Sequence, residues 1–201
     1  SVDQAVAVAG FGAVESMVLS VGVTTALPSA PVDGFDNRRF WWAASRRATV
    51  ARAFALELHP VTASLSFTAG LLQDMAVPML AAARPDYGAV LTEWHAGGGD
   101  LHELERSKFG WSHDLVADWL CAAWELPEAL SAAISAHHDQ DDDAIPAAVR
   151  LVAPFREVEH LQALDLVVAR ASEGYGMDPD RVVALILEAE AEAGQVAAMF
   201  V

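Results

Sequence analysis

The 201-residue chain contains a single cysteine, Cys121, and a single lysine, Lys108. With one cysteine, no disulfide can form within the chain, which fits a reducing, cytoplasmic environment. Lysine and arginine together number 12 against 28 acidic residues, so the formal net charge is −16. Nucleic acids and anionic membrane surfaces attract positively charged proteins. The charge therefore argues against both as partners.

Long uninterrupted apolar runs are also missing. Glycine, proline or a charged residue breaks each apolar stretch before the roughly 20 residues that a membrane helix needs. The first residues lack the basic start of a signal peptide. Val2, Ala5, Val6 and Ala9 already follow the spacing of a helix face. We therefore expect the chain to begin inside a larger protein, with N-terminal helices of its domain missing.

Apolar residues are abundant, at 54% of the chain, and most of them recur with helical spacing. No segment shows the sustained alternation of a β-strand. We predict one all-α domain over residues 1–201, a compact multi-helix bundle of roughly nine or ten helices. The helices are expected at 2–9, 13–21, 38–58, 62–74 (with Pro78 marking its end or a kink), a short stretch through Leu80, 86–94, 101–108, 112–124, 127–138, 146–172 (interrupted near Pro154) and 178–198.

Four of these helices carry an acidic or histidine side chain beside an apolar stripe. Such side chains are costly to bury unless they have partners, so we expect them to converge. Imidazole and carboxylate ligands suit zinc, iron or manganese, and separate packed helices are able to hold a metal between them. The expected polar cluster consists of Asp74, His113, His137, His138 and Asp165.

Each of these residues also has a simpler interpretation. His113 has the position of a helix cap or of a core histidine with a partner. His137 and His138, beside an acidic loop, fit a solvated helix end. Asp165 is within reach of an arginine such as Arg170 or Arg150. The remaining histidines look like surface or loop residues without a role: His59, His95, His102 and His160.

A further set of motifs recurs in a specific order along nearly the whole chain. The set is Phe40-Trp41-Trp42 with Ser45, Ala69 to Asp74, Leu101 to Glu105, Phe109-Gly110, His113, Trp119-Leu120, Trp124 to Pro127, Ile134 to His138, and Leu164-Asp165. In this order and spacing the chain resembles the HDOD domain. That domain is a divergent, usually non-catalytic branch of the HD phosphohydrolase superfamily in bacterial signalling proteins.

The chain departs from the superfamily pattern at two positions. The paired histidine and aspartate appear here as Gln73-Asp74, and an earlier histidine would fall at about Ala44. Both losses remove ligands from one metal position, and a catalytic metal must hold and polarise a water. The resemblance therefore implies no catalytic residues and no required cofactor. The five clustered residues remain compatible with one residual Fe, Mn or Zn ion.

The resemblance implies a non-enzymatic regulatory domain that acts by binding other proteins in a bacterial signalling pathway. Trp41-Trp42 and Trp94 are candidates for exposed aromatic anchors, although the simpler interpretation, which we favour, places them in the core. Two alternatives remain. One is a metal-dependent phosphohydrolase acting on a nucleotide or cyclic dinucleotide. The other is a sensor that binds a small ligand, without turnover, in the remnant of the hydrolase pocket around Asp74 and His138. The sequence leaves the partner, the signal and the oligomeric state open.

Overall fold

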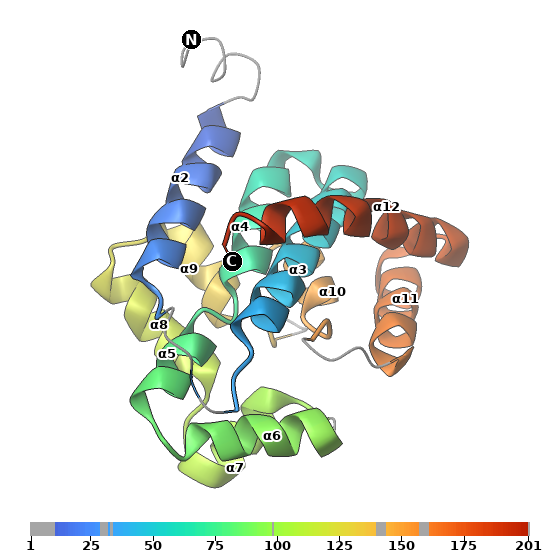
Figure 1. Cartoon of the computed structure of the whole chain (residues 1–201). Coiled ribbons are helices and arrows are strands. Elements are labelled where there is room, and N and C mark those ends of the chain that lie inside the picture. Colours follow the sequence, from blue (N-terminus) through green and yellow to red (C-terminus); the bar gives the residue numbers. More distant parts are fainter. Residues whose placement is uncertain are drawn as a thin grey trace.

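The long helix α3 (Asn37–Leu58) is the central element of the computed structural model (Figure 1). It begins where the Asp36 side chain accepts hydrogen bonds from the backbone N–H groups of Arg38 and Arg39, which have no partner inside the helix. It ends before Pro60, which cannot continue a helix. Along α3 pack α4 (Ala63–Leu72), α10 (Ala147–Val152) and α12 (Pro179–Ala197).

The structure describes residues 11–28, 32, 34–97, 99–139, 144–156 and 161–200. Within these ranges the elements are helical, apart from one isolated bridge between Val32 and Phe35. The prediction of an all-α domain is confirmed, while the helix expected at 2–9 lies outside the described residues. The other elements are α2 (Phe11–Ala26), the 3-10 turn η1 (Pro60–Thr62), α5 (Ala76–Ala83), α6 (Tyr87–Gly97), α7 (Leu101–Phe109), α8 (His113–Ala123), α9 (Glu128–Ser135) and α11 (Leu161–Tyr175).

Two apolar cores share α3, the larger one from Phe40 to Ala48 and the second from Val50 to Ala55. The larger one joins α3 to helices α2 and α4–α9, with Phe40, Leu72 and Ile134 among its buried residues. The second joins α3 to α10, α11 and α12 and contains Phe54 and Ile186. Figure 1 shows α11 and α12 on one side of α3, away from α6 and α7. Helix α3 therefore connects the part of the chain that holds the candidate site to its C-terminal part.

Two predicted helix ends were wrong in ways that matter for the site. We expected Pro78 to end or kink a helix over 62–74, but α4 ends at Leu72 and Pro78 lies in the first turn of α5. A first-turn N–H has no helical partner, so proline is tolerated there. The helix expected to run to 138 ends at Ser135. Asp74 and the pair His137-His138 consequently lie in short turns between helices.

One segment, Pro60–Ala83, is apolar and long enough to cross a membrane by length and composition alone. Its most apolar window is 72% buried within the domain. The segment spans η1, α4 and α5 and contributes to the larger core. It therefore has the properties of the core helices of a folded domain.

Candidate functional site

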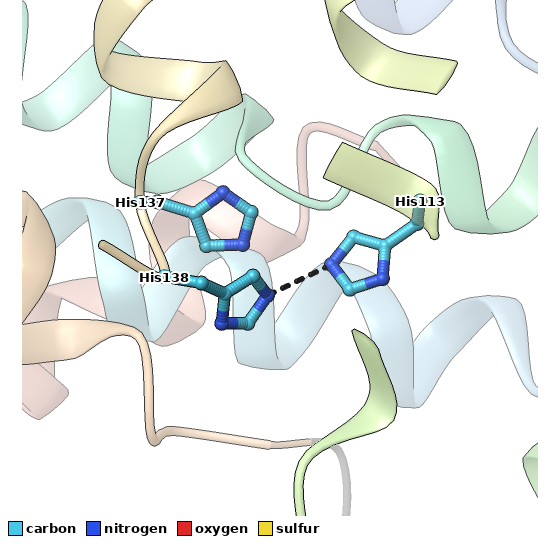
Figure 2. Close-up of side chains that lie close together, drawn as sticks. All are labelled: His113, His137 and His138. Atoms are coloured by element: carbon cyan, nitrogen blue, oxygen red, sulfur yellow. Dashed lines mark hydrogen bonds between the residues drawn. The ribbon is translucent and has the colours of Figure 1, made fainter. Parts of the chain in front are cut away.

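Three histidines gather at one point of the larger core (Figure 2). His113 is the first residue of α8, and His137 and His138 follow the end of α9. One ring nitrogen from each of the three lies within 4.8 Å of those of the other two. The Nε2 atoms of His113 and His138 are 3.1 Å apart. The structure thus brings together three of the five residues that we expected in a polar cluster.

Asp74 joins this cluster from the turn between α4 and α5. Its Oδ1 atom lies 3.5 Å from Nε2 of His113 and 3.4 Å from Nε2 of His137. Its other oxygen, Oδ2, forms an ion pair at 2.9 Å with Nη2 of Arg47 on α3. The two oxygens of one carboxylate therefore face different groups, imidazoles on one side and a guanidinium on the other.

Arg47 is held in place by the main chain. Its Nη1 atom donates to the carbonyl oxygen of Phe155 at 2.9 Å, and its Nε donates to that of Gly70 at 3.4 Å. The side chain is only 2% exposed. The sequence contains a signal for this burial that our prediction did not use, because Arg47 lies one turn from both Ala44 and Ala51 on the buried face of α3.

Glu105, on α7, supports His113 from behind. Its fully buried carboxylate accepts hydrogen bonds from the backbone N–H of His113 and from Nδ1 of the same ring, both at 2.7 Å. The Tyr87 hydroxyl donates to its other oxygen. Glu105 follows the buried Leu101 by one helical turn, so its inward position could have been predicted from the sequence.

Charge sets the protonation of the cluster. Burial would raise the pKa of Asp74, but the nearby charge of Arg47 and the contact with His113 hold that pKa well below its usual range. Burial would lower the pKa of His113, but the charge of Glu105 and hydrogen bonds to Asp74 and Glu105 raise it to about 10. Burial and the neighbouring histidines lower the pKa of His138. Without a bound metal, these shifts favour the charged form of His113 and the neutral form of His138. A metal ion at Nε2 of His113 would displace the proton there.

The orientation of His137 favours a cation at this point. Its Nδ1 atom donates to the carbonyl oxygen of Ile134 at 2.6 Å, so in the neutral ring Nε2 carries only a lone pair. That Nε2 atom is buried and has no hydrogen-bond partner among the described residues, yet it faces a carboxylate oxygen of Asp74. Two lone pairs facing each other require a proton or a metal ion between them. The residues therefore fit a divalent metal.

Two predictions about the surrounding residues were wrong. Asp165 is exposed on α11 and does not join the cluster, because the residues that this helix buries are Val167 and Ala171. Asp165 precedes Val167 by two positions, which places it on the opposite face of the helix. His102, to which we assigned no role, stacks on His138 with ring centroids 4.1 Å apart. His59 is exposed, and His160 lies outside the described residues.

Comparison with known protein families agrees with this architecture. The sequence model of the HDOD domain matches residues 1–140. The chain belongs to the HDOD domain family. The matched range includes α2–α9 and thus the four residues of the cluster, whereas α10–α12 lie beyond it. The predicted family is confirmed. No curated protein matches the chain.

Solved structures share the fold of this HDOD chain over almost its whole length. A provisionally named phosphohydrolase from Shewanella amazonensis SB2B has a TM-score of 0.75 at 18% identity, covering 100% of this chain and 77% of its own. An HDOD domain protein of unknown function from Geobacter sulfurreducens has a TM-score of 0.74 at 20% identity, with coverages of 98% and 74%. A provisionally named signal transduction protein from Marinobacter aquaeolei VT8 has a TM-score of 0.70 at 21% identity, covering 95% of this chain and 45% of its own.

Proposed function

We propose that this HDOD chain is a non-enzymatic regulatory domain that acts through protein–protein interaction in bacterial signal transduction. The observation that carries the proposal is the state of Asp74. One oxygen of this carboxylate is bound by the buried guanidinium of Arg47. The adjacent Gln73 is fully buried, and neither polar atom of its amide has a hydrogen-bond partner among the described residues.

Hydrolysis of a phosphodiester at such a site would need a metal that binds and polarises a water. The methyl group of Ala44 supplies no ligand, and an amide oxygen such as that of Gln73 is a poorer ligand than imidazole for zinc or iron. Arg47 adds a fixed positive charge on the same carboxylate. These features support a domain that retains the frame of a hydrolase without its catalytic ligands.

A surface for a protein partner lies on the outer side of α8. Trp119 is 60% exposed and Leu115, one turn earlier, is 41% exposed. Beside them is a groove of about 430 Å³ lined by Arg106, Gly110, Trp111, Ser112, Asp114, Leu115, Asp118 and Ser135. Of the candidate anchors, Trp41 and Trp94 are buried, in agreement with the core interpretation, and Trp42 is partly buried. Exposed tryptophans are frequent binding hot spots, which supports this face as the one that meets a partner.

The absence of turnover is the first test of this function. We expect the purified chain, supplied with Mn²⁺, Fe²⁺ or Zn²⁺, not to hydrolyse bis(p-nitrophenyl) phosphate or a cyclic dinucleotide above the rate of the metal alone. Product release would be followed by absorbance and by chromatography. Hydrolysis by the wild-type chain that disappears in an Asp74→Ala variant would show that the site is catalytic and would overturn the proposal.

The α8 surface provides the second test. We expect Trp119→Ser to remove most binding to any partner that the wild-type chain co-purifies with, because the exposed indole would form the centre of the contact. The matched control is Val61→Ser at η1, where the side chain is 92% exposed. Binding would be compared by affinity isolation with quantitative mass spectrometry. Equal loss in both variants would show that the α8 surface is not the specific contact.

A further inference from the structure

We propose that Arg47 serves as a built-in second cation at the histidine cluster, so that the site takes one divalent metal ion and excludes a second. The ion would be held by Nε2 of His113, His137 and His138 together with Oδ1 of Asp74. Arg47 would be a positioning residue, since it acts on the metal through Asp74.

The first observation is that the two oxygens of the Asp74 carboxylate contact different groups. Oδ1 faces the rings of His113 and His137 at 3.5 and 3.4 Å, while Oδ2 is bound to Arg47 at 2.9 Å. A carboxylate that bridges two metal ions commonly gives one oxygen to each. Here one of the two already neutralises a guanidinium, so only Oδ1 is left for an ion.

The second observation is that the Arg47 side chain is fixed beside Asp74. Its guanidinium is fixed by the carbonyl oxygens of Phe155 and Gly70, and its side chain is almost fully buried. An arginine side chain does not lose its proton in proteins. Ala44, one turn earlier on the same helix, offers no donor atom beside it. The Arg47 side of Asp74 therefore carries a permanent positive charge and, in Ala44, lacks a ligand for a metal.

The third observation is that the histidine rings facing Oδ1 of Asp74 are oriented to bind a cation. Glu105 accepts from Nδ1 of His113, and the carbonyl oxygen of Ile134 accepts from Nδ1 of His137. Bonds of this kind orient metal-binding imidazoles and leave Nε2 directed at the metal. The buried Nε2 of His137 has no hydrogen-bond partner among the described residues, although it faces an acidic oxygen. A metal ion bound there would satisfy this atom and Oδ1 of Asp74 together.

The experiment compares metal binding by the wild-type chain, Arg47→Met and Arg47→Lys. Each protein is stripped with a chelator, checked for its fold by circular dichroism and titrated with Co²⁺, whose visible absorption reports coordination. Zn²⁺ content after dialysis gives the stoichiometry. We expect one ion per wild-type chain and its loss in His137→Ala. Arg47→Met should bind one ion at least about tenfold more tightly, because a repelling charge on the shared carboxylate has gone.

Arg47→Lys is the control for structure. It keeps the charge but shortens the side chain, so it should not bind the ion more tightly than the wild type does. Absence of a retained ion in the wild type, binding of two ions, or an Arg47→Met affinity no higher than that of Arg47→Lys would each overturn the proposal. If Arg47→Met does not fold, Gln73→His decides: with Arg47 present it should still hold one ion, and two would refute the inference.

Discussion

Replacing Glu105 with alanine is expected to destabilise the domain by about 3–5 kcal/mol, the range for removing one member of a buried charged pair. Glu105 is fully buried and accepts hydrogen bonds from the Tyr87 hydroxyl and from both the backbone and the ring of His113. Without it, three donors lose their partner, and the charged ring of His113 loses the carboxylate that balances it on the α7 side. Urea unfolding followed by circular dichroism measures this loss.

Glu103 provides a matched control on the same helix. Its side chain is 68% exposed and lies 3.1 Å from Nε2 of His102, so Glu103→Ala should change the free energy of unfolding by less than about 1 kcal/mol. A Glu105→Gln variant removes the charge but keeps the size of the side chain. This variant should have a lower His113 pKa, measured by NMR, because the charge of Glu105 is the largest contribution that raises that pKa. A loss below about 1 kcal/mol in Glu105→Ala would show that the network is not structural.

Most of the fold could be predicted from sequence because helical periodicity and helix-breaking residues are local signals. The prediction of a helix over 38–58 differs from α3 by one residue at its start, since Asp36 and Pro60 mark its ends. Local signals failed where a break depends on packing. The turn at Gln73–Met75 precedes Pro78 rather than coinciding with it, and the chain leaves α9 before His137.

The candidate site was predictable only in part, for the same reason. Asp74, His113 and His137 were recognisable because histidine and aspartate are unusual next to apolar stripes. Arg47 and Glu105 have equally unusual positions, but long charged side chains normally reach the surface from such places. Which face of α11 would be buried depended on its contacts with α12 and α10, and Asp165 was therefore misplaced.

The segment after α10 also contributes to the site, although it lies beyond the family match. The carbonyl oxygen of Phe155, just after α10, accepts from Arg47, and Arg47 in turn binds Asp74. Phe155 itself is buried in the second core. The two cores are thus coupled through one guanidinium. A change that separates α3 from α4 should be felt both in stability and at the cluster.

Gly70→Ala should push α4 away from α3, and we expect it to destabilise the domain by about 1–3 kcal/mol. A Cβ atom at Gly70 would lie 2.9 Å from the carbonyl oxygen of Arg47 and 3.2 Å from Cα of Ala48, both of them backbone atoms. Backbone cannot turn aside as a side chain can, so α4 must move away from α3. Thermal and urea unfolding would measure the cost.

The matched control is Gly194→Ala in α12, where an added Cβ would meet nothing within 4 Å. Alanine has the higher helix propensity, so this variant should be as stable as the wild type or more stable by up to about 1 kcal/mol. Because the carbonyl oxygen of Gly70 also accepts a hydrogen bond from Arg47, the shift of α4 should weaken that bond as well. Equal stability of the two glycine variants would mean that α3 and α4 do not approach as closely as their contact at Gly70 requires.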